Sequence, residues 1–173
     1  MKFGIDQLLE DFSLRKPLVG KRIALLAHPA SVTADLTHTL DALATVPDIK
    51  LTSAFGPQLG IPIFSLYGEV RKPTDAMMGT FDVLLVDLQD LGCRIYTFIT
   101  TLRYVLEAAA QHKKSVWILD RPNPAGRPVE GLALRPSWES FVGAGAMPMR
   151  HGLTMGELAN WFISTLKLDV DCQ

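Results

Sequence analysis

The residues of this chain that are able to do chemistry gather at the ends of its short apolar runs. They are carboxylates, amides, arginines and histidines, namely His28, Gln58, Asp87, Gln89, Asp90, Arg94, Asp120, Arg121, Asn123, Arg150 and His151. Two carboxylates in different surroundings suit acid–base hydrolysis of a glycosidic bond. Arginines beside them suit a substrate that carries a carboxylate, because guanidinium groups bind carboxylates through paired hydrogen bonds.

The densest group of such side chains is DLQDLGCR, residues 87–94. Asp87 and Gln89 share a face for as long as the strand lasts, since side chains alternate along a strand. An acid inside an apolar strand needs a partner, because an isolated buried charge is costly, and we expect Arg94 to be that partner. Asp90 has two open interpretations: it caps the following helix, or it contacts a ligand.

Three other places keep more than one interpretation each. Residues 120–124, DRPNP, form either a strand-ending turn or part of a site, and Arg121 favours a site because a turn does not need an arginine. Glu130 lies among prolines and glycines, where it is either solvated or aimed back at the other polar residues. His151 precedes the last helix. Its role is that of a general acid or base, of another member of the site, or of a plain helix cap.

The elements that must position these residues alternate along the chain. Short apolar runs typical of buried strands span residues 22–28, 50–55, 61–67, 81–88 and 115–119. Helices are predicted over residues 35–43, 98–112 and 154–166, the last with a Thr154–Glu157 capping box, and residues 125–146 form an irregular excursion. This alternation predicts an α/β fold with a mainly parallel sheet and helices on both faces. The polar residues then meet beyond the carboxyl ends of the strands, where such sheets bind ligands.

The bulk composition excludes several classes of protein. The 173 residues, 48% of them apolar and 20% charged, fit one globular domain, and a net charge of −1 gives no support for a nucleic-acid or membrane-surface partner. We expect a cytoplasmic protein from the sequence as written, since it has no membrane-length apolar run and no secretory signal. Cys93 and Cys172 are expected to be free, mostly buried thiols. The oligomeric state is not predicted.

Several common signatures do not occur in the sequence. There is no glycine fingerprint of a dinucleotide site after the first strand, no phosphate-binding P-loop and no GxSxG nucleophile elbow. Neither an HExxH motif nor a Cys/His cluster is present, so a zinc site is not expected.

Longer motifs run in order almost from one end of the chain to the other. They are GID (4–6), LVGKRI (18–23), FGPQ (55–58), LYG (66–68), RKPT (71–74), DLQDLGCRIYT (87–97), LDRPNP (119–124), VEG (129–131), SFVG (140–143) and RHGLTMGEL (150–158). Through these motifs the chain resembles the NamZ family of exo-β-N-acetylmuramidases, long known only as a domain of unknown function. The resemblance implies a Rossmann-like N-terminal domain over residues 1–167, with residues 168–173 beginning a truncated C-terminal domain.

The resemblance also implies an activity and a partner. The activity is release of N-acetylmuramic acid from the non-reducing ends of peptidoglycan fragments, and the partner is a muropeptide or another saccharide that contains muramic acid. No metal or organic cofactor is implied. Together with the polar strand ends, the resemblance makes Glu130, Asp90, Asp87 and His151 the catalytic candidates. The candidates for substrate binding are Gln58, Gln89, Arg94, Tyr96, Asp120, Arg121, Asn123 and Arg150.

One departure from the family pattern bears on catalysis. Many members read FGPEHG and continue into a loop, whereas here Gln58 stands in place of the glutamate and LGIP follows at once. Two hypotheses follow: a glycosidase impaired by the missing loop, or a catalytically inactive sugar-binding remnant. A nucleotide-binding domain is a weaker third hypothesis, because the glycine fingerprint is absent.

Overall fold

The computed structural model of the chain describes residues 2–55, 61–66, 68 and 70–173. Within these ranges it contains a five-stranded sheet in the order β3-β2-β1-β4-β5, and every neighbouring pair is parallel. The strands are β1 (Arg22–Ala27), β2 (Lys50–Phe55), β3 (Ile63–Phe64), β4 (Val83–Asp87) and β5 (Ser115–Ile118). The prediction of a parallel α/β sheet is confirmed.

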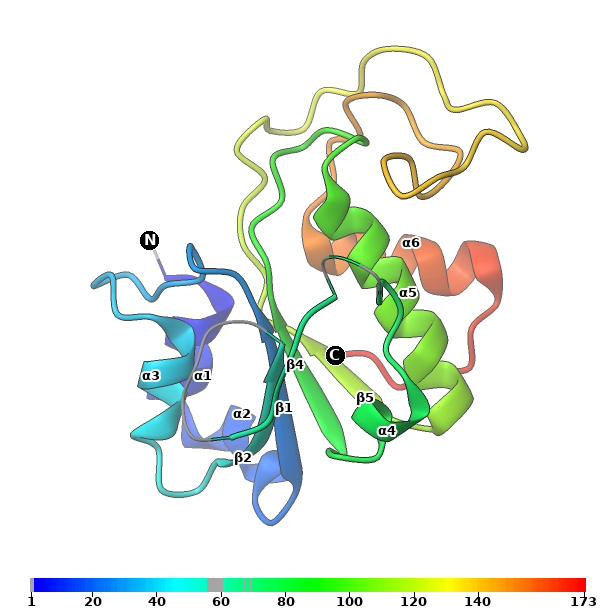
Figure 1. The fold of residues 1–173 in the computed structure, drawn as a ribbon. Helices are drawn as coiled ribbons and strands as arrows, with labels where there is room; N and C mark the ends of the chain where they lie inside the picture. Colours follow the sequence, from blue (N-terminus) through cyan, green and yellow to red (C-terminus); the bar gives the residue numbers. More distant parts are fainter. Residues whose placement is uncertain (1, 56–60, 67, 69) are drawn as a thin grey trace.

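Helices cover both faces of this sheet, which gives three Rossmann-like layers (Figure 1). One face carries α1 (Gly4–Glu10), α2 (Phe12–Arg15), the 3₁₀ turn η1 (Lys16–Leu18) and α3 (Thr39–Ala44). The other face carries α4 (Asp75–Met78), α5 (Thr97–His112) and α6 (Met155–Leu166). No helix in the described ranges is long and apolar enough to cross a membrane.

The strands are apolar on both faces because each face meets its own helical layer. Leu84 and Val86 of β4 belong to the core under α5 and α6, whereas Val83 and Leu85 belong to the core under α1 and α3. Alternating side chains therefore enter two separate cores. This double burial explains why the strands read as continuous apolar runs rather than as alternating patterns.

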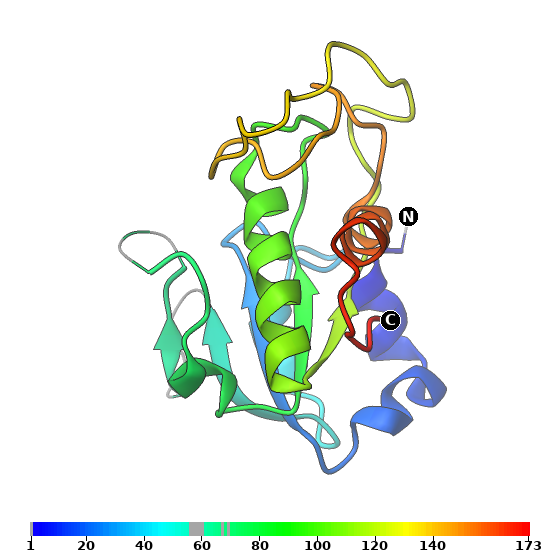
Figure 2. The same cartoon turned by 90° about the vertical axis from the view of Figure 1, so that its right-hand side faces the viewer.

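The order of the strands determines where a ligand is expected. The chain runs from β1 outward to β2 and β3, and then crosses to β4 on the other side of β1. The connections therefore diverge at the carboxyl ends of β1 and β4, and doubly wound sheets bind ligands in the crevice at such a point. Residues 125–146, the yellow to orange excursion in Figure 2, lie beyond this same edge of the sheet.

Two predicted elements differ most from the structure. The helix predicted over 35–43 begins only at Thr39, and Leu36 is exposed with a positive φ of 68°. His38 supplies the cap, accepting a hydrogen bond from the Leu40 N–H, so the helix cannot extend backward through the preceding turn. Of the described residues in the third predicted strand, only Ile63 and Phe64 form β3, and they pair with Ala54 and Phe55 at the edge of the sheet. Tyr67, the last residue of that prediction, lies outside the described residues.

Both ends of the chain are fastened near β5. The unpredicted helix α1 starts at Gly4, whose N–H donates to the carbonyl of Asp120, and a Cβ on Gly4 would come within 2.6 Å of that backbone. At the other end, Asp171 and Gln173 exchange backbone hydrogen bonds with Val116 and Ile118 of β5. The proposed division between residues 167 and 168 stays a prediction.

Candidate active site

The crevice between the carboxyl ends of β1 and β4 contains two adjoining pockets. The larger has a volume of about 350 Å³ and the smaller about 120 Å³. His28 and Phe98 line both pockets, and their ring centroids are 5.2 Å apart. These two rings therefore stand at the boundary between the pockets.

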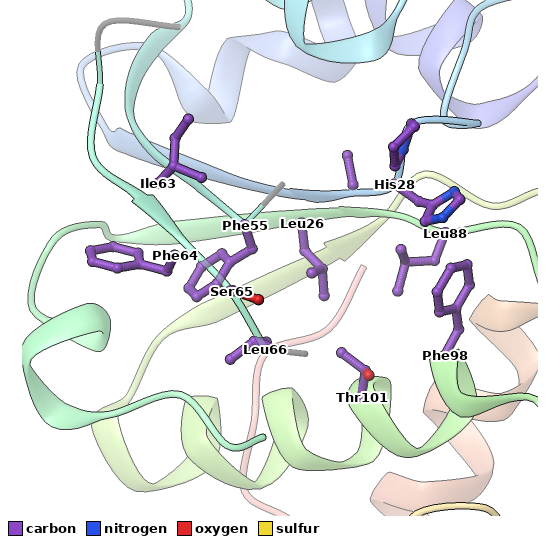
Figure 3. Close-up of a pocket in the computed structure, with 12 residues that line it drawn as sticks. Leu26, His28, Phe55, Ile63, Phe64, Ser65, Leu66, Leu88, Phe98 and Thr101 are labelled. Atoms are coloured by element: carbon purple, nitrogen blue, oxygen red, sulfur yellow. The ribbon is translucent and has the colours of Figure 1, made fainter. Parts of the chain in front are cut away.

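The larger pocket is mainly apolar. In Figure 3 its walls come from the ends of β1 and β2, from β3, from the residue after β4 and from the first turns of α5. The apolar lining residues are Leu26, Ala27, Pro29, Phe55, Ile63, Phe64, Leu66, Leu88 and Phe98, and the others are His28, Ser65 and Thr101. This pocket is thus a hollow at the end of the core beneath α5.

Four of the seven described residues that line the smaller pocket carry polar groups, namely His28, Ser31, Gln89 and Tyr96. The turn after β1 fixes two of them. Ser31 donates from its N–H to the carbonyl of His28 at 2.8 Å and from its hydroxyl to the carbonyl of Asp87 at 2.5 Å. The Nδ1 of His28 accepts from the Ala30 N–H at 3.2 Å, so a neutral His28 carries its proton on Nε2.

Asp87, a catalytic candidate, is buried beneath this crevice in a closed network. Arg121 donates to both of its carboxylate oxygens at 2.6 and 2.9 Å, and the hydroxyl of Thr39 also donates to it. Arg121 donates further to the carbonyl of Val32 at 2.7 Å. The prediction that Arg94 pairs with Asp87 is wrong. Asp87 does have a partner, as its burial requires, but that partner is Arg121, which follows β5.

Arg94 instead fastens the loops above the sheet. Its Nη1 donates to the carbonyls of Leu132 and Met147 at 2.9 and 2.5 Å, and the residue is buried. Its N–H donates to the carbonyl of Met149. These bonds tie together residues 88–96, 123–134 and 147–153, which we call the loop layer.

Asp90 and His151 form a buried pair inside the loop layer. Asp90 accepts a hydrogen bond from the Gly92 N–H at 2.7 Å, which closes a tight turn, whereas α5 begins only at Thr97. Of the two interpretations left open for Asp90, the cap of the next helix is therefore wrong. Nε2 of His151 lies 3.0 Å from Oδ2 of Asp90, an ion-pair distance, but the two atoms are not aligned as a hydrogen bond. Nδ1 of His151 accepts from the Leu153 N–H, and Thr154 provides the cap of α6.

Glu130 and Arg150 form the exposed pair of the loop layer. Their backbones exchange two hydrogen bonds, and Nη1 of Arg150 lies 3.0 Å from Oε2 of Glu130. The side chain of Glu130 is 65% exposed, and that of Arg150 is 32% exposed and also donates to the carbonyl of Ala125. Glu130 is thus held in place and reaches solvent.

The remaining predicted residues make contacts within the protein. Asp120 accepts from the Thr154 hydroxyl at 2.6 Å and from the Gly156 N–H at 3.0 Å, at the start of α6. The Oδ1 of Asn123 accepts a hydrogen bond from the Ala125 N–H, and its Nδ2 donates to the Leu153 carbonyl. Gln89 donates to the carbonyls of Asp90 and Pro122 while it lines the smaller pocket.

The structure therefore divides the predicted site residues into three groups. Gln89 and Tyr96 line the smaller pocket, and Glu130 and Arg150 lie on the exposed side of the loop layer. The other described candidates, Asp87, Asp90, Arg94, Asp120, Arg121, Asn123 and His151, are engaged by the protein itself. Gln58 lies outside the described residues. Within the described ranges no three His, Cys, Asp or Glu side chains gather as metal ligands would.

Sequence reasoning missed the apolar half of the crevice. Leu88 is the last residue of the strand predicted over 81–88, and Phe98 is the first residue of the helix predicted over 98–112. At such positions an apolar side chain resembles ordinary core. His28 was noted as a strand-end residue but was not selected for the site. Its signal was position, because it directly follows β1, at the edge of the sheet where ligands are expected.

Comparisons with known proteins connect this geometry to a family. The profile described as exo-beta-N-acetylmuramidase NamZ, N-terminal, matches residues 57–173. The peptidoglycan beta-N-acetylmuramidase NamZ of Bacillus subtilis (strain 168) is 42% identical over 189 positions, which include 97% of this chain. The chain belongs to the NamZ family. The family profile describes the N-terminal part of such proteins, and this NamZ chain spans 45% of the Bacillus relative.

Two solved structures of DUF1343 family proteins from Bacteroides fragilis NCTC 9343 have the same fold. One superposes with a TM-score of 0.91 at 38% identity, and the other with 0.86 at 32%. Each covers 99% of this NamZ chain, which in turn covers 48% and 50% of those chains. The alignment with the Bacillus relative has 189 positions against 173 residues here, so at least 16 positions of that relative have no counterpart in this chain.

Proposed function

We propose that this chain is a glycoside hydrolase domain that releases N-acetylmuramic acid from the non-reducing ends of peptidoglycan fragments. The observation that carries the proposal is the 42% identity to a peptidoglycan β-N-acetylmuramidase across 97% of the chain. At this identity the whole domain, including the motifs around the crevice, shares one ancestry with that relative.

The geometry supports substrate binding in the crevice and acid–base catalysis by the neighbouring loop layer. The crevice offers pockets with polar and aromatic walls at the edge where α/β sheets bind ligands. The loop layer offers Glu130, a carboxylate that reaches solvent and is held by Arg150. We assign Glu130 as the general acid or base, because among the described catalytic candidates it is accessible to a substrate, whereas Asp87 and Asp90 are buried.

The test is release of the sugar from a chromogenic N-acetylmuramoside by the folded protein. Glu130→Gln is expected to lower kcat by 10²-fold or more, because a positioned acid or base contributes about that much. Glu139→Gln, which changes another exposed glutamate of the same excursion, is the matched control and should keep full turnover. Full activity of Glu130→Gln would remove Glu130 from the mechanism.

A second candidate function is supported by two differences between this chain and the family members it resembles. At least 16 positions of the Bacillus enzyme have no counterpart here, and Gln58 replaces the glutamate expected from the family pattern. These differences favour a catalytically inactive, sugar-binding domain. Calorimetric binding of N-acetylmuramic acid without release of the chromogen would select this alternative, and turnover by the folded wild type would exclude it.

A further inference from the structure

We propose that the larger pocket of the crevice receives the N-acyl chain of an amino sugar and accepts chains longer than acetyl. This inference rests on the proposed function, since it places the sugar ring at the mouth of the adjoining smaller pocket, beside Ser31, Gln89 and Tyr96. The residues that determine this specificity are the two boundary rings, His28 and Phe98, and the apolar wall beyond them, including Ile63, Phe64 and Leu66.

The size and lining of the larger pocket indicate an apolar occupant. Nine of the twelve described residues that line it are apolar, and the volume is about 350 Å³. An apolar cavity of about 150 Å³ is enough to bind benzene. A single acetyl methyl would therefore leave most of this space empty, whereas a chain of several methylenes would fill it.

The boundary between the pockets suits an amide. In an N-acyl amino sugar the amide joins a polar ring to an apolar chain. Here the smaller pocket, with polar side chains in its lining, joins the apolar pocket at His28 and Phe98. Nδ1 of His28 accepts the Ala30 N–H, which leaves an Nε2–H donor for the amide carbonyl. A charged or strongly polar group would be desolvated without partners among the phenylalanines and leucines beyond this point.

The walls are held in position before any ligand binds. The turn of residues 28–31 is closed by the hydrogen bonds of Ser31 to His28 and Asp87. Phe55 packs between Phe64 and Phe81, with ring centroids at 5.5 and 6.4 Å. Because little ordering remains to be done, the affinity is expected to follow the apolar area that the ligand buries.

The experiment is calorimetric titration of the folded chain with N-acetyl-, N-propanoyl-, N-butanoyl- and N-pentanoylmuramic acid. Each added methylene should improve Kd by about threefold to fourfold, the ratio that corresponds to full burial of one CH₂. Ser65→Phe places a ring at the exposed end of the pocket lining and should abolish this dependence on chain length. Ser164→Phe, at an exposed position of α6 outside the pocket lining, is the matched control and should preserve it.

Two further variants separate the parts of the proposal. His28→Phe keeps a ring but removes the donor, so Kd should weaken by a similar factor for all four ligands while the chain-length dependence remains. Ile63→Ala widens the pocket, so the gain per methylene should continue to a longer chain than in the wild type. The Ile63→Ala pattern differs from the uniform loss that a merely destabilised fold would give. For His28→Phe, an unchanged melting temperature shows that the uniform loss comes from the missing donor and not from unfolding.

The outcomes distinguish this inference from the proposed function. If N-acetylmuramic acid binds but longer chains bind equally or less well, the pocket assignment is wrong and the sugar-binding function stands. If none of the four ligands binds the folded protein, both are overturned. A chain-length dependence that Ser65→Phe leaves intact would place the acyl chain elsewhere and would also contradict the inference.

Discussion

Two ion pairs at the same edge of the molecule differ in nearly everything except their chemistry. Asp87 and Arg121 join the ends of β4 and β5, and their side chains are 0% and 4% exposed. Glu130 and Arg150 join two segments of the loop layer, and their side chains are 65% and 32% exposed. The first pair is enclosed by protein and holds the edge together, whereas the second is open to a ligand. The residue types indicate which edge of the sheet carries the site. The burial of each residue then determines whether it supports the fold or is accessible to a ligand.

The enclosed pair explains why an acid is tolerated inside an apolar strand. Every carboxylate oxygen of Asp87 has a donor, from Arg121 or Thr39, and Arg121 is also stacked 4.7 Å from the ring of Phe3. Such a pair need not stabilise the fold relative to apolar residues, but breaking it leaves an uncompensated buried charge. Breaking the exposed pair has no such cost, because water solvates the charge of the remaining partner.

The largest expected effect comes from breaking the enclosed pair. Arg121→Met should lower the free energy of unfolding by about 3 to 5 kcal/mol, because Asp87 is left charged, buried and without its main partner. Urea unfolding followed by circular dichroism measures this loss. Glu130→Gln is the matched control from the exposed pair and should change stability by less than about 1 kcal/mol.

A double-mutant cycle sharpens this result. Asp87→Asn in the Arg121→Met background removes the stranded charge, so the double variant should lose much less than the sum of the single losses. Equal costs for Arg121→Met and Glu130→Gln would contradict the distinction between the two pairs.

A smaller effect is expected at Asp120, whose burial is intermediate between that of Asp87 and that of Glu130. Its carboxylate accepts from the Thr154 hydroxyl and the Gly156 N–H at the start of α6. Asp120→Ala should cost about 1 to 3 kcal/mol, since it removes two hydrogen bonds and a favourable charge at a helix N-terminus. Asp120→Asn keeps an acceptor and should lose less in the same urea titration; an equal loss would mean that the hydrogen bonds are not the cause.

The smallest effect is expected at an exposed pair, Glu157 with Arg127, and it depends on pH. The hydrogen bond from Arg127 holds the pKa of Glu157 below its ordinary value. A carboxyl whose pKa is lower in the folded state stabilises the fold above the unfolded pKa of about 4.3, and this contribution is lost as the pH falls further. The melting temperatures of the wild type and Glu157→Gln should therefore differ slightly at pH 7 and converge toward pH 3. A gap that widens on acidification would contradict this.

Much of the fold followed from local patterns in the sequence. β2 and the capping box of α6 were predicted at their observed positions, because a buried strand and a Thr–x–x–Glu cap each carry their cause in adjacent residues. The start of α3 was not predicted, since leucine spacing alone does not show that His38 takes the capping position. Helix α1 was missed because its buried face depends on contact with a distant strand end.

The site was predictable in composition but not in the assignment of partners. The strand-end rule brought the correct polar residues to one edge, yet Asp87 could have met either Arg94 or Arg121, which differ in tertiary position and not in chemistry. The apolar pocket had no signature, because Phe98 and Leu66 look like core residues until a hollow is found beside them. The burial of Asp90 and His151 likewise depends on how the loop layer folds over them.

The central claim is that the crevice and the exposed pair contact the ligand while the enclosed residues only support them. Titration of ¹⁵N-labelled protein with N-acetylmuramic acid tests it most directly, with the imidazole signals of His28 and His151 as internal reporters. The account predicts shifts at the His28 ring and at the amides of Ser31, Tyr96 and Glu130, with little change at the His151 ring. Shifts centred on the His151 ring, with His28 and Glu130 unaffected, would contradict it.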